Sequence, residues 1–204
     1  GRYFLNSLLV TSVTVAVSLI INSMAGYVFA RINFKYRDAL FILILIGMMI
    51  PPQVTMIPVF SMLRGFPLAG GNNILGEGGR GLINSYAGLI IPFIAGSFGV
   101  FLCRQFFVGF PKELDDAAEM DGCGRFRAFF RIYLPLGTPV LASLAVLKFT
   151  GTWNEYTWPL VMTNSDSMKT VQLALALFNN ESGTEWNLLM AATILVSLPI
   201  YIVF

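Results

Sequence analysis

The sequence predicts an all-α, polytopic membrane protein, and its composition and segment lengths are the observations that predict it. Hydrophobic residues make up 56% of the 204 residues and charged residues only 12%, whereas a soluble domain carries about 25% charged residues. The apolar residues gather into runs, and each uncut run exceeds the roughly 20 residues that a helix needs to cross a bilayer. These runs should be helical because lipid satisfies no backbone polar groups.

Five spans are expected. They run from about Tyr3 to Ala30, from about Ala39 to Leu63, from about Tyr86 to Val108, from about Pro139 to Met162, and from about Leu188 to the end of the sequence. Pro51, Pro52 and Pro58 interrupt the second span. Such a break is compatible with a plain kinked helix or with a helix that lines a wet cavity. Residues 1–204 are expected to form a single transmembrane domain that is trimmed at both ends.

Basic residues in the loops set the expected orientation. The loops after the first and third spans carry eight Lys and Arg residues between Arg31 and Arg131, whereas the opposite loops carry Arg64, Arg80 and Lys169. Because basic loops stay in the cytoplasm, the side with eight basic residues is predicted to be cytoplasmic. A net charge of only +2 makes nucleic acid an improbable partner.

The residue inventory excludes several kinds of chemistry. The chain has no His and two Cys, so His-based acid–base catalysis and most metal sites are absent, and no catalytic residue or metal site is expected. The segment 65–85 is rich in Gly and Asn but lacks the G-K-[ST] ending of a phosphate-binding loop. It is interpreted as a flexible outer loop.

A charge-dense hairpin, residues 111–135, separates two apolar spans. Pro111 should open a short helix, and Gly122 and Gly124 should end it in a sharp turn. Leu114, Ala117, Ala118 and Asp121 share one face of that helix, and the two alanines make the face thin enough for a partner to approach. Four aromatic residues follow at helical spacing and suit an interfacial anchor: Phe126, Phe129, Phe130 and Tyr133. An ordinary amphipathic loop is the alternative.

The fourth span carries a second candidate site. Lys148 and Glu155 are seven residues apart and therefore lie on one helix face, where charged residues usually face a cavity or a partner. Aromatic and amide side chains cluster nearby and suit sugar binding: Trp153, Asn154, Tyr156 and Trp158. The alternative is an interfacial aromatic belt.

The hairpin also resembles the cytoplasmic EAA loop of ABC importer permeases. Asp116-Ala117-Ala118 is followed by Gly122 and then by Ile132, Leu134 and Pro135 at the spacing of that family's pattern, with Asp in place of the first Glu. The segments W-N-E-Y-x-W-P-L at 153–160 and E-W-N at 185–187 extend the resemblance over nearly the whole chain. It looks like a carbohydrate-uptake permease, similar to the maltose-type G or glycerol-3-phosphate-type E subunit.

The resemblance implies a type I ABC importer transmembrane fold, with five helices of an expected six present here. It implies a multi-pass subunit of a prokaryotic inner membrane that works with a second permease, two copies of an ABC ATPase and an external solute-binding protein. This chain would bind no cofactor, and ATP and Mg would be bound by the ATPase. The implied ATPase-coupling residues are Leu114, Asp116, Ala117, Ala118, Met120, Asp121 and Gly122.

The resemblance also assigns a role to an outer loop, and other function classes remain open beside it. The implied contact with the binding protein comprises Asn179, Asn180, Glu181, Ser182 and Gly183. The translocation pathway would use Lys148, Trp153, Asn154, Glu155, Tyr156 and Trp158. A secondary transporter or an intramembrane enzyme without an ATPase partner is the alternative function. A secondary transporter would be expected to show internal repeats and buried coupling carboxylates.

Overall fold

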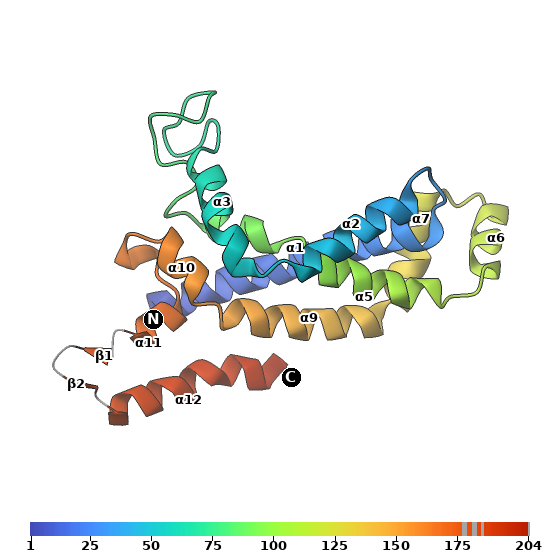
Figure 1. The fold of residues 1–204 in the computed structure, drawn as a ribbon. Helices are drawn as coiled ribbons and strands as arrows, with labels where there is room; N and C mark the ends of the chain where they lie inside the picture. The colour runs from blue at the N-terminus through green and yellow to red at the C-terminus, as the bar shows by residue number, and fades with distance from the viewer. Residues whose placement is uncertain (177–178, 181–182, 185, 204) are drawn as a thin grey trace. The chain divides into compact units, whose positions relative to one another are not determined.

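The computed structural model describes residues 1–176, 179–180, 183–184 and 186–203, and helices dominate them (Figure 1). The chain divides into two compact units. One unit contains residues 1–15, 51–93 and 146–204, and we call it the outer unit because it holds the loops expected outside; the inner unit contains residues 16–50 and 94–145. Helices α1 (Arg2–Arg31) and α9 (Thr138–Trp153) each contribute residues to both units.

The helices meet the length and composition expected for membrane spans. Helices α1 and α12 (Trp186–Val203) are each long and apolar enough to cross a membrane. Counting each of three bent helix pairs as one span raises the number of candidate spans among the described residues to five, which agrees with the five expected. The expected fourth span is divided, because α9 ends at Trp153 and a short α10 (Thr157–Met162) follows it.

The inner unit packs α1 against α5 (Ser97–Val108) at close range. A Cβ placed on Gly26 would lie 2.5 Å from Cys103 Cβ, so only glycine permits this approach, as is common between membrane helices. Asn22 is fully buried on α1; its Nδ2 donates to Ser18 Oγ (2.7 Å) and its Oδ1 accepts a hydrogen bond from Gly96 N (3.1 Å). This amide therefore joins α1 to the start of α5. The unit also contains α2 (Arg37–Met49).

The outer unit contains several short helices, α12 and a small hairpin. Its elements are α3 (Pro52–Arg64), α4 (Tyr86–Ile90), η1 (Ile91–Phe93), α10, η3 (Asp166–Met168), α11 (Val171–Ala176), α12 and the two-residue strands β1 (Asn179–Asn180) and β2 (Gly183–Thr184). The strands pair antiparallel, with Asn179 opposite Thr184 and Asn180 opposite Gly183. A core of aliphatic and aromatic side chains binds the helices together: Val10, Leu63, Ile83, Leu89, Trp158 and Met162.

The prolines of the expected second span act differently from one another. The break at Pro51-Pro52 is confirmed: α2 ends at Met49, and Pro52 is the first residue of α3, where its missing N–H costs nothing. The second expected break is wrong, because Pro58 lies inside α3, which continues to Arg64. A single missing hydrogen bond within the helix is tolerated there.

Candidate functional site

The coupling hairpin (residues 111–135) consists of four short helical segments in the inner unit. They are α6 (Glu113–Met120), α7 (Arg125–Ala128), the π-helix η2 (Phe129–Tyr133) and α8 (Leu134–Leu136). The expected helix at Pro111 begins two residues later, at Glu113. Pro135 lies within α8, and Gly137 separates α8 from α9.

The glycine turn at the end of α6 has the geometry that the sequence predicts. Gly122 adopts φ +65°, a left-handed conformation that favours glycine. Gly122 N donates to Glu119 O (3.0 Å) and Cys123 N donates to Ala118 O (2.8 Å). These two bonds form a Schellman motif, which satisfies the last carbonyls of the helix and reverses the chain immediately after α6.

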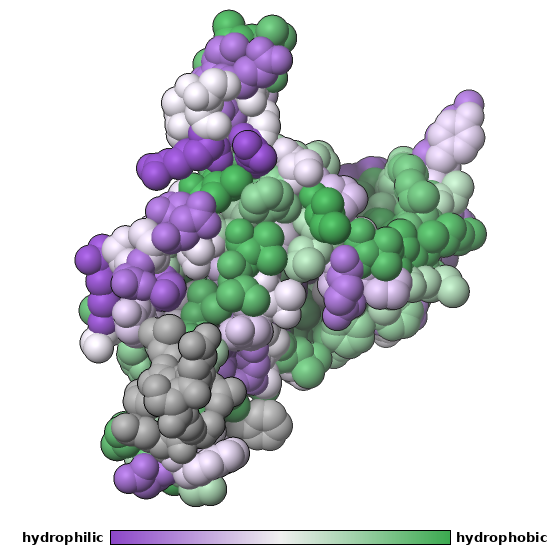
Figure 2. Space-filling view, turned by 60° about the vertical axis from the view of Figure 1, so that its left-hand side comes forward, coloured by the Kyte–Doolittle hydropathy of each residue, from purple (hydrophilic) through white to green (hydrophobic). Residues whose placement is uncertain are grey.

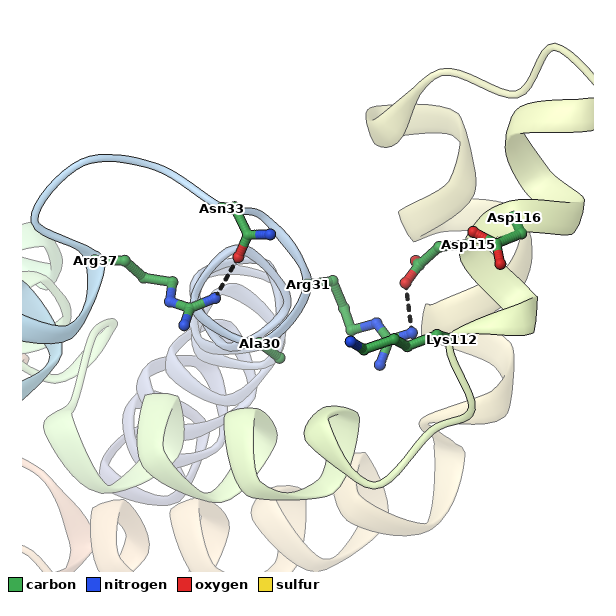
Figure 3. A pocket seen from close by; sticks show the side chains of 7 residues that line it. All are labelled: Ala30, Arg31, Asn33, Arg37, Lys112, Asp115 and Asp116. Carbon is green, nitrogen blue, oxygen red and sulfur yellow. Dashed lines mark hydrogen bonds and ion pairs between the residues drawn. The ribbon is translucent and has the colours of Figure 1, made fainter.

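The Arg31 cluster (Arg31, Asp115 and Tyr133) holds α6 against the end of α1. Figure 3 shows its ion pair between Arg31 and Asp115. Asp115 pairs with the Arg31 guanidinium through one carboxylate oxygen and accepts a hydrogen bond from the Tyr133 hydroxyl through the other. The Arg31 side chain is only 7% exposed, and its Cζ lies 5.5 Å from the centre of the Tyr133 ring. The arginine is therefore largely shielded from water while Asp115 is partly exposed, and salt screens such a partly buried pair less than it screens a pair on the surface.

Both stems of the coupling hairpin are tied to the last turn of α1. Arg31 Nη1 donates to Phe110 O and Arg31 Nη2 donates to Pro111 O, each at 2.9 Å. On the other stem, the Tyr27 hydroxyl donates to Arg125 O at 3.1 Å. Tyr27 and Arg31 are four residues apart and so lie on one face of α1. A displacement of the hairpin must therefore move this turn or break these bonds.

The two alanines of α6 differ in exposure, although both were expected on one accessible face. Asp116 and Ala117 are exposed, and Met120 is 89% exposed, so this side is accessible to a partner. Ala118 is buried within the chain itself, because it faces the inner unit. The face that was expected to present both alanines to a partner therefore presents Ala117 alone. Leu114 is half-buried and Asp121 is exposed.

The aromatic residues of the hairpin also divide into two sets. Phe129 and Tyr133 belong to the buried core of the inner unit, whereas Phe126 and Phe130 are exposed. A single continuous stripe is thus not observed. The π-helix between Phe129 and Tyr133 widens the turn there, and such segments are frequent at functional sites.

A half-open cleft of about 410 Å³ lies beside the Arg31 cluster. Figure 3 shows its lining, which is rich in charged side chains: Ala30, Arg31, Asn33, Arg37, Lys112, Asp115 and Asp116. Arg37 donates to Asn33 Oδ1 at 2.8 Å. The cleft carries three cationic and two anionic groups, so it suits a partner surface of mixed charge.

The tryptophans of the fourth span are core residues of the outer unit. Trp153 Nε1 donates to Val196 O and Trp158 Nε1 donates to Gly88 O, each at 3.0 Å. Trp153 is 1% exposed and stacks on Phe149 with ring centroids 5.6 Å apart. In this conformation neither indole offers a face to a sugar, and neither forms the interfacial belt that was the alternative.

The polar residues around the break between α9 and α10 have local partners. Glu155 Oε1 accepts a hydrogen bond from Trp158 N (2.9 Å), which replaces a backbone bond lost at the break. Asn154 Oδ1 accepts one from Gln172 Nε2 (3.1 Å), and Lys148 Nζ donates to Phe93 O (3.0 Å). Tyr156 is 41% exposed. Asn154 and Tyr156 thus remain accessible to a solute.

A small cavity of about 10 Å³ borders Glu155. Hydroxyl side chains contribute to its lining: Ser7, Thr11, Thr152 and Thr170. Ligand sites for small molecules enclose about 300–1,000 Å³, so this cavity is too small for a sugar. Of the candidate pathway residues, Glu155 and Trp158 line this cavity, and the other four do not.

The predicted binding-protein contact falls partly outside the described residues. Glu181 and Ser182 lie outside them, and Asn179, Asn180 and Gly183 are described only as members of β1 and β2. Nearby, Lys169 Nζ lies 2.6 Å from Asp166 Oδ1, and this hydrogen bond raises the pKa of Lys169 above its usual range. The contact between residues 179–183 and a binding protein remains a prediction.

Comparisons with known proteins support the fold and show the family of the chain. Residues 22–204 match the family described as binding-protein-dependent transport system inner membrane component. The chain is 37% identical, over 99% of its length, to the arabinooligosaccharides transport system permease protein AraQ of Halalkalibacterium halodurans. It is 34% identical, over 98% of its length, to the lactose transport system permease protein LacG of Rhizobium radiobacter.

A third relative and a solved structure complete the comparison. The chain is 33% identical, over 98% of its length, to the sn-glycerol-3-phosphate transport system permease protein UgpE of Yersinia pestis. It spans 66–68% of the length of these three relatives. Its fold superposes with a TM-score of 0.83 on a chain of a bacterial ABC transporter involved in the import of the acidic polysaccharide alginate. The superposition covers 99% of this chain and 71% of that chain, and the two sequences are 23% identical.

Proposed function

Because this chain belongs to the family of binding-protein-dependent transport system inner membrane components, we propose that it is the permease subunit of an ATP-driven importer that moves a sugar or sugar-like solute into the cytoplasm. Two of the relatives above are named for arabinooligosaccharides and lactose, and the third for sn-glycerol 3-phosphate. The common feature of these names supports a carbohydrate-like substrate.

The geometry of α6 carries the proposal. One side of α6 is free for a partner, with Met120 89% exposed, while Asp115 fixes the other side to Arg31 of α1. A partner ATPase, which binds ATP and Mg, contacts the free side. When that partner moves, the Arg31 cluster passes the displacement to α1, because α6 cannot shift alone without breaking a shielded ion pair.

The predicted coupling residues take different parts in this arrangement. Asp116, Ala117 and Met120 contact the ATPase, with Leu114 and Asp121 at the margins of that surface. Ala118 and Gly122 shape the hairpin, since Ala118 is buried and Gly122 forms the turn. This chain itself takes no catalytic part. It works with a second permease subunit and two ATPase copies.

The solute path uses the accessible polar groups near the break in the fourth span. Asn154 and Tyr156 are exposed, and both hydrogen-bond readily with sugar hydroxyls. Lys148, Glu155, Trp153 and Trp158 support that region through their bonds to backbone atoms. The external binding protein delivers the solute and touches the outer hairpin at residues 179–183.

Reconstitution tests the proposal directly. The chain is placed in proteoliposomes with its second permease, its ATPase and its binding protein, and uptake of arabinooligosaccharides, lactose and sn-glycerol 3-phosphate is measured with internal ATP. We expect uptake of one of these classes that requires ATP hydrolysis and the binding protein. A hydrolysis-deficient ATPase is the control. Uptake that persists with this ATPase would support a secondary transporter and overturn the proposal.

A further inference from the structure

The segment after the glycine turn carries a second exposed surface, which we call the Arg–Phe face. It consists of the exposed side chains of α7 and η2: Arg125, Phe126, Arg127, Phe130 and Arg131. Phe126 and Phe130 are 69% and 41% exposed, and their rings meet edge to face with centroids 4.9 Å apart. The face is therefore a pair of packed aromatic rings flanked by cationic groups.

The opposite side of the same segment is fixed to the inner unit. Ala128, Phe129 and Tyr133 are buried there, with Tyr133 fully buried. The Tyr133 hydroxyl also donates to Asp115 of α6. Because residues on one side of a helix cannot turn outward without moving those on the other, the Arg–Phe face is held away from the core of the unit. It is available to a partner from outside the chain.

The charge of the Arg–Phe face excludes the partner that contacts α6. The sequence has no Asp or Glu between Asp121 and Glu155, and among the described residues none of the three arginines forms an ion pair. Helix α6, in contrast, contains four acidic residues and no basic one. A protein surface complementary to α6 is positively charged and would repel the Arg–Phe face. The ATPase is therefore a poor occupant of this face.

The direction of the segment places it at the surface of the bilayer. Its axis, from Arg125 to Leu136, is bent by 76° from the axis of α9, with which the next expected span begins. Over about 18 Å of its own length the segment therefore advances only about 4 Å along the α9 axis. One headgroup region of a bilayer is roughly 5–7 Å deep. The segment thus stays at the level where α9 enters the bilayer, on the side of the basic loops.

Arginine and phenylalanine at that level fit one occupant. Figure 2 shows that exposed apolar side chains are frequent on this chain, so the exposed rings alone do not identify a binding site. Amphipathic segments with basic and aromatic residues lie at the boundary between headgroups and hydrocarbon, and arginine forms paired hydrogen bonds with phosphate. Anionic lipids of the cytoplasmic leaflet attract such basic segments. We propose that the Arg–Phe face binds the headgroups of anionic phospholipids in the cytoplasmic leaflet.

This lipid contact gives the coupling hairpin a base at the membrane. Tyr133 joins the lipid-bound segment to Asp115 of α6, and Asp115 pairs with Arg31 of α1. When α6 is displaced, the anchored segment resists the movement, so that more of the displacement reaches α1. The contact depends on the chain being a membrane subunit and not on which solute it imports.

Quenching by brominated lipids measures the contact and its headgroup preference. The full complex carries Phe126→Cys with a fluorescent bimane label, Cys103 and Cys123 are replaced by Ser, and the partner subunits lack cysteine. Proteoliposomes contain brominated phosphatidylglycerol or brominated phosphatidylcholine at equal mole fraction. We expect stronger quenching by phosphatidylglycerol, and excess inorganic phosphate should not reduce it because the ligand is a lipid. Equal quenching by the two lipids would overturn the inference.

Variants that remove charge test the role of the arginines. In the labelled chain, Arg125→Gln, Arg127→Gln and Arg131→Gln should together abolish the preference for phosphatidylglycerol, with a loss of about fivefold for each arginine. Replacing the same three residues by Lys retains the charge and should retain most of the preference. The matched control is Lys35→Gln, which removes an exposed cation from the loop between α1 and α2. A wild-type preference in the triple Gln variant would contradict the inference.

The same label distinguishes lipid from the ATPase as the occupant. Bimane at position 126 should be quenched by brominated phosphatidylglycerol with the ATPase present or absent. Bimane on Met120→Cys of α6 is the control, and it should respond to the ATPase and not to the brominated lipid. If position 126 is quenched only when the ATPase is absent, that subunit covers the Arg–Phe face and the inference fails. A complex that imports no solute would overturn the proposed function and leave this measurement unaffected.

Discussion

Arg31, the last residue of α1, forms an ion pair with Asp115 in α6 across 84 positions of sequence. The arginine side chain is 7% exposed and the aspartate side chain 35% exposed. The same guanidinium donates to two backbone carbonyls that precede α6. The relationship matters because it joins α6, which we propose contacts the ATPase, to a helix that is long enough to cross a membrane.

Asp115→Asn should loosen the hairpin and lower the efficiency of coupling. The amide retains the size of the carboxylate and its carbonyl oxygen can still accept from Arg31, but the charge of the pair is lost. A hydrogen bond to a charged group contributes about 1.5–3 kcal/mol and a neutral one about 0.5–1.5 kcal/mol. We expect a lower melting temperature of the purified chain and less solute imported per ATP hydrolysed. The measurement is the ratio of uptake to phosphate release in proteoliposomes.

The control for this change is Asp38→Asn, which removes an exposed pair with Arg37. Exposed pairs contribute about 0–1 kcal/mol, so this variant should match wild type in both measurements. If Asp115→Asn has the wild-type melting temperature and the wild-type ratio of uptake to phosphate release, the Arg31 cluster has no part in coupling.

Ala117 and Ala118 should respond differently to enlargement. Ala118 is buried, and overpacking a tight site costs about 1–3 kcal/mol, so Ala118→Leu should lower the melting temperature of the isolated chain. Ala117 is exposed, so Ala117→Leu should leave that temperature unchanged and weaken co-purification of the ATPase. Equal melting temperatures for the two variants would contradict the observed orientation of α6.

Trp158→Phe should reduce stability without changing solute affinity. The substitution removes the indole N–H that donates to Gly88 O in the core of the outer unit. A buried carbonyl left without its partner costs about 1–3 kcal/mol. Thermal unfolding of the chain in detergent measures the first effect, and the substrate concentration for half-maximal uptake measures the second. A change in that concentration at unchanged stability would assign Trp158 to the solute path instead.

Local features of the fold could be predicted from the sequence because their causes are local. Pro51 and Pro52 end one helix and begin the next, and Gly122 closes α6 in a left-handed turn. In each case the backbone restriction resides in the residue itself. The exposed side of α6 could not be predicted in full. Helical spacing places Ala117 and Ala118 on adjacent positions but does not say which of them the rest of the inner unit covers.

Two other features depend on contacts that sequence order does not reveal. From the sequence alone, Arg31 is a loop charge and Tyr133 an interfacial aromatic, since nothing near either of them indicates Asp115 as a partner. The composition of residues 65–85 predicts a flexible loop. Glycine supplies freedom in one setting and permits close approach in another, and the composition is the same in both. The 2.1 Å distance from a Gly70 Cβ to Gly81 O distinguishes them.

Asn154→Ala should lower the rate of uptake, whereas Glu155→Gln should leave it nearly unchanged. Asn154 is exposed beside the break in the fourth span, and its partner Gln172 lies in the same accessible region. Glu155 instead accepts the Trp158 backbone N–H through Oε1, and the glutamine carbonyl oxygen preserves that bond. Glu155→Ala removes it and should lower stability by about 0.5–1.5 kcal/mol. Uptake in proteoliposomes at saturating binding protein measures the rates. Among the described residues, the amide of Asn154 forms a side-chain hydrogen bond only with Gln172, so a structural effect of its removal should be small. Wild-type uptake for Asn154→Ala would therefore show that this residue is not part of the solute path.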